Sequence, residues 1–241
     1  MSKRYRTFKR RVLRSPIAFG SIAVIIVCAA LIVVSFIWSR EVSIDRIASE
    51  HADNSIVPAV KEDDHIRGNA SSAVILYVYT DTECPYCKNL HEYTIPRLER
   101  EYGSNIAVVY RHNPLDTIHP LARHEHEALE CAYNQGGDPA FWHFIDRIFT
   151  LTKSNETFPP AELENIALQY GLDSKKFHAC IEDKSTSTRV SRDSRDAALA
   201  SIDVTPSTVV AGKGRSILVS GNYYSQLRAA IEVILRSSAT P

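Results

Sequence analysis

The sequence predicts an α/β domain whose strands are separated by a block of helices, preceded by one N-terminal transmembrane helix. Three features of the 241 residues carry this prediction. An uncharged apolar segment lies near the N-terminus, a strand of buried type leads directly into a Cys-x-x-Cys pair, and two late strands follow a long stretch with helical spacing. We expect one folded domain over residues 62–241, large enough to have its own core.

The apolar segment spans residues 16–38. It carries no charge and is long enough to cross a hydrocarbon core of roughly 30 Å as a helix. Seven basic residues and no acidic residue precede it, which predicts a cytoplasmic tail over residues 1–15 and an extracytoplasmic position for the rest of the chain. A cleaved signal peptide is the alternative, but its apolar region would span about 7–15 residues and end at a small-x-small site. We therefore expect a single-pass protein of the cell membrane.

Charge is balanced in total but unevenly distributed, with 28 basic and 28 acidic side chains. Residues 41–241 hold 20 of the basic and all of the acidic ones, a net charge of −8. An acidic body argues against nucleic acid as a partner. Residues 41–70 are polar and lack a sustained period, so we interpret them as a tether, with the linker itself over residues 39–61.

The first elements of the domain surround the cysteine pair. Ala73–Tyr79 is apolar and β-branched, which predicts a strand buried on both faces in the centre of a sheet covered by helices. A helix should follow from Pro85 to about Glu101, and Pro96 should kink it because proline removes a helical hydrogen bond. Ile106–Tyr110 is predicted to be a second short strand.

The middle of the chain is predicted to be helical. Five segments show helical spacing or start signals, namely His119–Asn134, Pro139–Thr150, Pro160–Tyr170, Ser174–Glu182 and about Ser185–Ser201. Two late strands, Ser207–Ala211 and Ile217–Ser220, flank Gly212-Lys213-Gly214, which indicates a hairpin. An amphipathic helix over Tyr223–Arg236 closes the chain, and the helical insertion covers about residues 114–201.

Cys84-Pro85-Tyr86-Cys87 is the chemically informative motif. With Cys84 at the N-cap and Pro85 at the first helical position, free amide donors and the positive end of the helix face the Cys84 sulfur. Such a cysteine has its pKa lowered from about 8.5 into roughly the 3.5–7.5 range and becomes a nucleophile, and Cys87, one turn on, resolves the mixed disulfide. The alternatives are a zinc site completed by His91 with His112 or His119, and a purely structural disulfide.

Several motifs together carry a resemblance to a known family. They are Asp64-His65-Ile66-Arg67-Gly68-Asn69, Thr80-Asp81-Thr82-Glu83-Cys84-Pro85-Tyr86-Cys87-Lys88, Arg111-His112-Asn113-Pro114-Leu115 with Ile118-His119-Pro120, Glu130-Cys131-Ala132 with Gln135-Gly136, Phe141-Trp142, and Val204-Thr205-Pro206-Ser207. Over about residues 62–236 the chain resembles the DsbA-like thioredoxin family. The resemblance implies a thioredoxin fold with a helical insertion and a thiol:disulfide oxidoreductase activity that needs no cofactor beyond the Cys84–Cys87 dithiol.

The resemblance also implies a substrate-binding edge. Pro206 looks like the cis-proline that faces the cysteine pair in this family, and it would expose the backbone of Thr205 to an extended substrate. Pro85 and Tyr86, between the cysteines, complete the expected substrate-binding group. The Pro-Tyr dipeptide occurs in oxidising, reducing and isomerising relatives alike, so the direction of electron flow is not inherited, although the branch is mostly oxidising.

Three cysteines lie outside the motif. Cys131 and Cys180 are either two buried thiols or a disulfide that links helices of the insertion. An extracytoplasmic position favours the disulfide, which would add roughly 4 kcal/mol to the free energy of unfolding. Cys28 lies in the apolar segment. His112, His119, His124 and His126 resemble a ligand cluster, but residues 124 and 126 point to different faces of one helix, so we expect no metal site.

We therefore expect a membrane-anchored oxidoreductase that exchanges disulfides with cysteines of exported proteins and has a redox partner in the membrane or the extracytoplasmic space. Oxidase is the favoured direction, and a reductase or isomerase, for example in cytochrome maturation, is the rival. Two non-enzymatic alternatives are a module that binds copper or zinc through Cys84, Cys87 and a histidine, and a scaffold with a thioredoxin-like fold.

Overall fold

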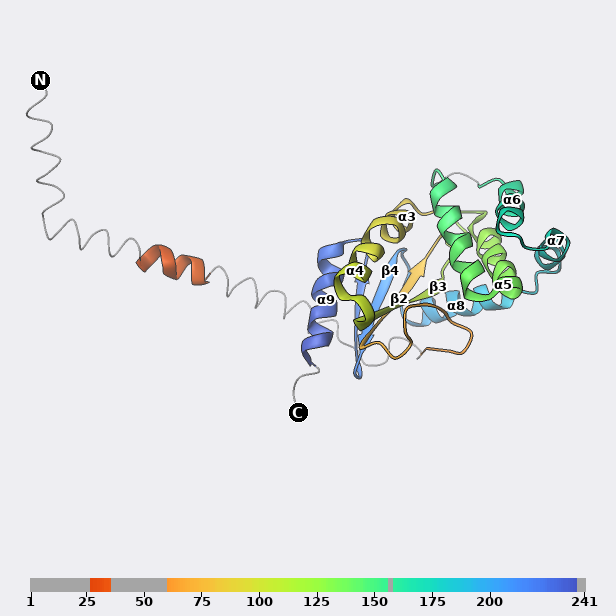
Figure 1. Ribbon diagram of the computed structural model, residues 1–241. Coiled ribbons are helices and arrows are strands. Elements are labelled where there is room, and N and C mark those ends of the chain that lie inside the picture. Colours follow the sequence, from red (N-terminus) through yellow and green to blue (C-terminus); the bar gives the residue numbers. More distant parts are fainter. Residues whose placement is uncertain (1–26, 36–59, 156–157, 238–241) are drawn as a thin grey trace, which may run out of the picture. The chain divides into compact units, whose positions relative to one another are not determined.

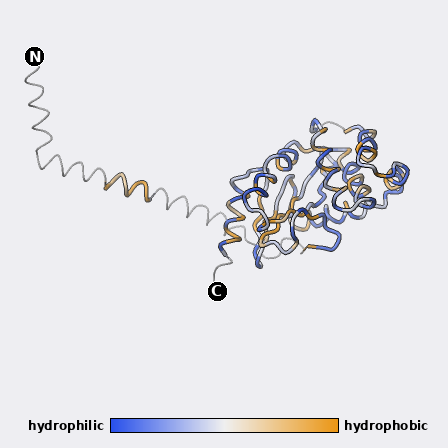
Figure 2. Tube along the Cα trace, in the orientation of Figure 1, coloured by the Kyte–Doolittle hydropathy of each residue, from blue (hydrophilic) through white to orange (hydrophobic). Residues whose placement is uncertain are grey.

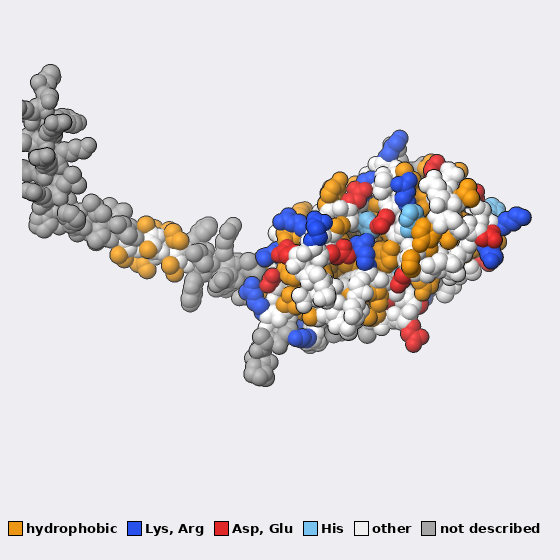
Figure 3. Space-filling model, in the orientation of Figure 1, with side chains coloured by type: hydrophobic (Ala, Val, Ile, Leu, Met, Phe, Trp, Pro, Cys, Tyr) orange, Lys and Arg blue, Asp and Glu red, His pale blue; other side chains and the backbone are white. Residues whose placement is uncertain are grey.

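The computed structural model describes residues 27–35, 60–155 and 158–237 of the chain. Its contacts divide it into two units, residues 1–50 and residues 51–241. In the first unit residues 27–35 are helical, and most of their exposed side chains are apolar (Figure 3). No helix within the described ranges is both long and apolar enough to span a membrane. The tail and most of the linker and of the 16–38 segment lie outside those ranges, so the transmembrane helix stays a prediction.

The second unit is built on a mixed five-stranded sheet, as expected for an α/β domain (Figure 1). Its strands lie in the order β1 (His65–Arg67), β3 (Ile106–His112), β2 (Val74–Thr80), β4 (Ser207–Gly212) and β5 (Arg215–Ser220). The central pair β2 and β3 is parallel, and the other three pairings are antiparallel. Every residue of β2 and β3 is buried, which agrees with the apolar sequence of both strands.

The cysteine pair opens a helix that changes its pitch after Asn89. It consists of α3 (Pro85–Asn89), the π-helical η1 (Leu90–Thr94) and α4 (Ile95–Tyr102). Pro96 has no N–H, and directly before it the Ile95 N–H bonds to Leu90 O, the wider spacing of a π turn. The kink expected at Pro96 is therefore present as a π segment.

The helical insertion separates β3 from β4. It comprises α5 (Ala122–Leu151), α6 (Pro160–Tyr170), α7 (Ser174–Asp183) and α8 (Ser187–Leu199). Gly137 breaks α5 with φ 64° and ψ −161°, a conformation that glycine adopts readily, so the two helices expected on either side of this point share one element. Figure 2 shows both apolar and hydrophilic residues along the traces of these helices. Among the apolar ones, Phe141, Phe144 and Phe177 are fully buried in one cluster.

The two faces of the sheet are covered by different helices. On one face α4 lies beside α9 (Tyr224–Arg236), where Tyr102 Oη donates to Glu232 Oε1 at 2.9 Å (Figure 1). On the other face Ala197 of α8 packs with Tyr77 and Val109 in one apolar cluster. Lys213 and Gly214 both have positive φ and form the two-residue hairpin between β4 and β5. The four strands β2 to β5, the hairpin and the closing helix agree with the sequence prediction.

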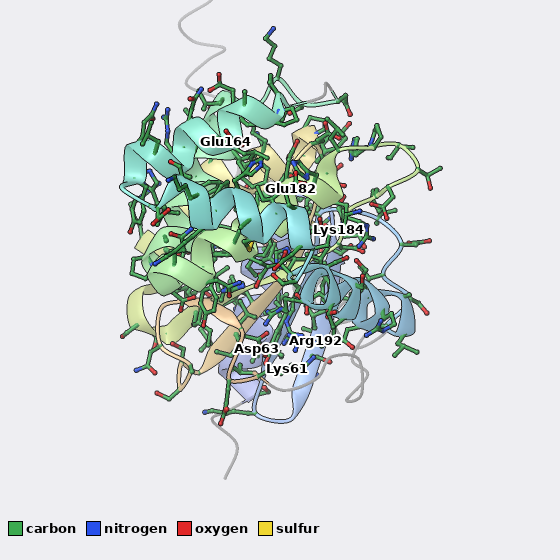
Figure 4. The ribbon with its side chains drawn as sticks, turned by 90° about the vertical axis from the view of Figure 1, so that its right-hand side faces the viewer. Lys61, Asp63, Glu164, Glu182, Lys184 and Arg192 are labelled. Atoms are coloured by element: carbon green, nitrogen blue, oxygen red, sulfur yellow. A yellow bond between two sulfur atoms is a disulfide. The ribbon has the colours of Figure 1, made fainter. Side chains whose placement is uncertain are left out.

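One strand was not predicted. The tether was expected to continue to residue 70, but His65–Arg67 forms β1 and pairs antiparallel with β3 at the edge of the sheet. Three residues are too few to show a period, and polar contacts rather than an apolar face hold this segment. The buried Asp64 carboxylate accepts a hydrogen bond from Arg111 at 2.6 Å, and Asp63 pairs with Arg192 of α8 at 2.6 Å (Figure 4).

Candidate active site

Cys84 and Cys87 lie where β2 gives way to α3. Cys84 is the N-cap, with extended backbone angles (φ −78°, ψ 123°), and Pro85 takes the first helical position, where its missing N–H leaves no hydrogen bond unmade. Pro85 and Tyr86 are exposed, whereas the Cys84 side chain is almost covered and that of Cys87 is fully buried. The two thiols thus occupy a surface edge and an interior position of one helical turn.

The two sulfurs have opposite electrostatic environments. A hydrogen bond from the Cys87 thiol, helped by the backbone amides of Cys87 and Tyr86, lowers the pKa of Cys84 from 9.0 to about 6 against the opposing effect of burial. Burial raises the pKa of Cys87 well above its ordinary value, and the neighbouring Cys84 raises it further. Near neutral pH Cys84 is therefore the thiolate and Cys87 the protonated thiol.

The expected substrate-binding edge lies directly beside Cys84. The Thr205–Pro206 peptide bond is cis, and the carbonyl oxygen of Thr205 lies 3.4 Å from Cys84 Sγ. Pro206 is buried, and its carbonyl accepts a hydrogen bond from the Gly221 N–H at 2.7 Å, which fixes this turn to the end of β5. Thr205, Pro206, Pro85 and Tyr86 are thus gathered around one sulfur.

The loop before Cys84 is held by a buried carboxylate. Asp81 accepts hydrogen bonds from the backbone N–H groups of Glu83 at 2.8 Å and Leu115 at 2.7 Å, and its carboxylate lies 3.1 Å from His119 Nδ1. Burial alone would lower the pKa of His119, but the charge of Asp81 raises it overall. His119 therefore helps to hold this loop.

Two charged side chains, Glu83 and Lys88, lie directly beside the cysteine motif in the sequence. Burial raises the pKa of Glu83, which is 1% exposed. Lys88 Nζ donates to the carbonyl oxygens of Phe149 and Thr152 at the end of α5. The lysine thus joins the cysteine-bearing helix to the insertion.

Cys131 and Cys180 are joined to each other. Cys131 of α5 and Cys180 of α7 form a disulfide with Cα atoms 5.8 Å apart and a sequence separation of 49. Within the described part of the chain Cys28, Cys84 and Cys87 are the cysteines with free thiols.

A buried histidine cluster joins β1, β3 and α5. Glu130 Oε1 accepts from His65 Nε2 at 2.5 Å and from His112 Nε2 at 2.6 Å, and His112 Nδ1 lies 2.7 Å from His126 Nδ1. Burial alone would raise the pKa of Glu130, but the two histidines lower it. Burial alone would lower the pKa of His65, but the hydrogen bonds that it donates to Asp138 and Glu130 raise it overall. The core of the cluster is therefore a buried ion pair.

This cluster is the place where a metal ion could be held. Among the residues with described placement, one group of three, His65, His112 and Glu130, brings its ligand atoms within 4.8 Å of one another. It includes neither cysteine of the motif. From the sequence His112 was grouped with His119, His124 and His126 and no metal site was expected, whereas in the structure it lies with His65 and Glu130. These three residues come from separate segments, so their spacing gives no signal.

Comparisons with known proteins agree with this site. The model of a thioredoxin family matches residues 60–232. The crystal structure of DsbA2 from Pseudomonas aeruginosa is similar with a TM-score of 0.61 and 28% identity, covering 75% of this chain and all of that one. BdbD from Bacillus subtilis, in its oxidised form, has a TM-score of 0.65 at 17% identity, covering 75% of this chain and 97% of that one, and shows the shared fold.

Curated relatives contain the same domain as a part of longer chains. The Na(+)/H(+) antiporter NhaA 3 of Salinispora tropica is 34% identical over 166 residues, which are 69% of this chain and 24% of the antiporter. The NhaA antiporter of Herminiimonas arsenicoxydans is 30% identical over 204 residues, which are 83% of this chain and 31% of that protein. The chain thus spans about a quarter to a third of these relatives.

The fold, the Cys84–Cys87 pair facing a cis-proline and the family match lead to one assignment. The thioredoxin arrangement with its helical insertion positions a nucleophilic thiolate, a buried resolving thiol and an accessible backbone edge at one place. The chain belongs to the DsbA-like thioredoxin-fold family and is a protein thiol:disulfide oxidoreductase.

Proposed function

We propose that this protein is a membrane-anchored oxidase that forms disulfides in exported proteins on the extracytoplasmic side of the cell membrane. One observation carries the proposal: the thiolate of Cys84 is stabilised, with a pKa of about 6, beside a resolving thiol whose pKa is raised. A stabilised thiolate leaves easily from a mixed disulfide and favours the reduced form of the dithiol, and both effects drive disulfides into substrates.

The reaction proceeds by two displacements at sulfur. A substrate thiolate attacks Cys84 Sγ of the Cys84–Cys87 disulfide, the sulfur–sulfur bond breaks, and its electron pair passes to Cys87, which takes up a proton. A second substrate thiolate then attacks the substrate sulfur of the mixed disulfide and releases the Cys84 thiolate. The substrate loses two electrons and the enzyme gains them, so a membrane or extracytoplasmic redox partner must reoxidise the dithiol in each cycle.

Substrate recognition is proposed to use the backbone edge at Thr205. An extended peptide beside a sheet edge gains main-chain hydrogen bonds whatever its sequence, which suits an enzyme with many substrates. The side chains of Val204 and Tyr86 are 47% and 63% exposed and offer apolar contact on either side of Cys84. Unfolded chains that still display apolar segments are the substrates that this surface fits.

The extracytoplasmic location rests on two independent features. The uncharged segment of residues 16–38 follows a basic tail, the pattern of an anchor with a cytoplasmic N-terminus. The Cys131–Cys180 disulfide is of the kind that persists in oxidising compartments. Both support a catalytic domain outside the cytoplasm.

Oxidation of a model substrate tests the proposal. The full chain, purified in detergent and oxidised, should transfer its disulfide to reduced, unfolded ribonuclease A without oxygen, with about one ribonuclease thiol pair lost for each Cys84–Cys87 disulfide. A protein that reduces insulin disulfides but leaves the ribonuclease thiols unchanged would be a reductase. Labelling of Cys84 in intact cells by a membrane-impermeant maleimide tests the location.

A further inference from the structure

A small cavity lies behind the resolving cysteine. It has a volume of about 20 Å³, is partly open to the surface, and is lined by β1, β2, β3, the cysteine-bearing helix and α5. Its aliphatic walls come from the sheet and from η1 and α4. Its polar lining consists of Arg67, Thr80, Cys87, His91, Tyr110 and Trp142.

The cavity suits one water molecule. A single water needs about 10–15 Å³ and two to four polar partners. Tyr110 Oη and Trp142 Nε1 are buried without a hydrogen-bond partner in the described protein, and both residues line the cavity together with the Cys87 thiol. A water molecule here would satisfy both orphaned groups and contact the sulfur.

Disulfide exchange requires Cys87 to gain and lose a proton. Cys87 leaves as a thiolate when the disulfide opens and must be a thiolate again when it attacks the mixed disulfide. The groups at its sulfur are Cys84, the backbone N–H of Asp81 at 3.4 Å and the hydroxyl of Thr80. In the mixed disulfide the Cys84 sulfur is bonded to the substrate, and neither the amide nor the hydroxyl takes up a proton near neutral pH, so the proton must travel farther.

Elimination among the lining residues leaves one proton acceptor. The guanidinium of Arg67 and the indole of Trp142 are hydrogen-bond donors only. Burial raises the pKa of Tyr110 well above its ordinary value, so the phenol does not ionise near neutral pH. Imidazole is the side chain that exchanges protons in that range, and His91 lines the same cavity as Cys87.

The surroundings of His91 suit this role. Its Nε2 lies 2.6 Å from Asp146 Oδ1 of α5, so the carboxylate accepts the Nε2 proton and leaves Nδ1 as the basic nitrogen. Arg67 is the other charged group nearby, with Nη1 3.9 Å from the same Asp146 oxygen and Nε bonded to Glu99 of α4 at 2.7 Å. His91 is 13% exposed, so a proton that it takes can pass on to solvent.

We propose that His91, oriented by Asp146, accepts the proton of Cys87 through a water molecule in this cavity and returns it in the reverse step. The water gives a proton to His91 Nδ1 and takes the thiol proton, which leaves a Cys87 thiolate and an imidazolium paired with Asp146. The thiolate then attacks Cys84 Sγ and expels the substrate thiolate. The proposal rests on thiol–disulfide exchange at Cys84 and Cys87 and holds for either direction of electron flow.

Stopped-flow reaction with 5,5′-dithiobis(2-nitrobenzoate) separates the two thiols. In the reduced full chain Cys84 attacks the reagent and releases a first nitrothiobenzoate, and Cys87 then attacks the adduct and releases a second. The rate of the second phase against pH reports on proton removal from Cys87. It should rise through the range in which imidazole titrates, about pH 5–8.

Three variants test the relay. His91→Gln should slow the second phase at pH 7 by about 10-fold or more and remove its rise with pH, with the first phase unchanged. Asp146→Asn should give a smaller slowing of the same kind. Val108→Ile, which adds a methyl group to the cavity wall without altering a titratable group, should also slow the second phase selectively.

His178→Gln is the matched control. His178 pairs with Glu164 at 3.1 Å, as His91 does with Asp146, but both partners are more than half exposed on α7 and α6 (Figure 4). It should leave both phases as in the unmodified protein. If the second phase of His91→Gln keeps the original rate and pH profile, the relay is wrong. If the unmodified protein shows no first phase, the exchange activity itself is wrong.

Discussion

Cys84 Sγ lies 3.4 Å from the carbonyl oxygen of Thr205, although 121 residues separate the two in sequence. The contact places the nucleophile at the backbone edge that precedes the cis-proline, while Cys87 stays buried. Under the proposed function, a peptide that adds to this edge brings its sulfur to Cys84.

Substitution of each cysteine should separate their roles. Cys84→Ser should abolish exchange, because the attacking sulfur is lost, whereas Cys87→Ser should accumulate mixed disulfides, because attack proceeds and resolution does not. Mass spectrometry of the variants after incubation with a cysteine-containing peptide checks both outcomes. Adducts on Cys84→Ser and none on Cys87→Ser would reverse the assignment.

The Cys131–Cys180 disulfide should be structural. Mild dithiothreitol should open Cys84–Cys87 and leave Cys131–Cys180 intact in peptide maps of the full chain. Replacing both Cys131 and Cys180 by Ala should lower the free energy of unfolding of the catalytic domain by roughly 4 kcal/mol, the loop-closure value for 49 residues. Alkylation of both cysteines in the untreated native protein would contradict the bond.

The buried ion pair at Glu130 should matter for folding. Glu130→Gln keeps the shape of the side chain but removes the charge opposite His65, and breaking a buried pair costs about 3–5 kcal/mol. Denaturant melts should show a loss of this order. Glu164→Gln, which removes the carboxylate of an exposed pair with His178, should change stability by less than about 1 kcal/mol. Equal effects of the two substitutions would show that the cluster is not a stabilising element.

The reduced form should lose stability in acid relative to the oxidised form. The folded pKa of Cys84 is lowered to about 6, below its value in the unfolded chain near 8.5. The stabilising contribution of the thiolate is therefore complete above about pH 8.5, declines as pH falls, and is gone below about pH 6. Denaturant melts of both redox forms between pH 5 and 9 measure this difference. Cys84→Ser lacks the thiolate and should show no such decline.

Much of this fold was predictable because its elements carry strong local signals. The apolar strand before Cys84, the Pro160–Tyr170 helix with its glycine stop and the glycine hairpin near residue 213 were all placed within one or two residues. The thiol pair was predictable because Pro85 marks a helix start and so puts Cys84 at the N-cap.

Other features depend on burial and on contacts between distant segments. β1 was missed because its three residues are held by the Asp64–Arg111 pair and not by an apolar pattern. His65 and Glu130 are 65 positions apart in the sequence, and His91 and Asp146 are 55 positions apart. No local spacing predicts such contacts. The sequence shows that Lys88 is close to the motif, but it does not show that this lysine donates a hydrogen bond to the backbone at the end of α5.

The reduction potential of the Cys84–Cys87 pair tests the central claim most directly. The full chain in detergent is equilibrated with glutathione buffers, and the redox state of the pair is read by alkylation and mass spectrometry, with Cys131→Ala/Cys180→Ala as a control for the second disulfide. A thiolate with a pKa of about 6 predicts an oxidising pair, less negative than about −200 mV, on the side of DsbA at about −120 mV. A value more negative than about −200 mV, approaching about −270 mV as in thioredoxin, would contradict the oxidase and make this protein a reductant.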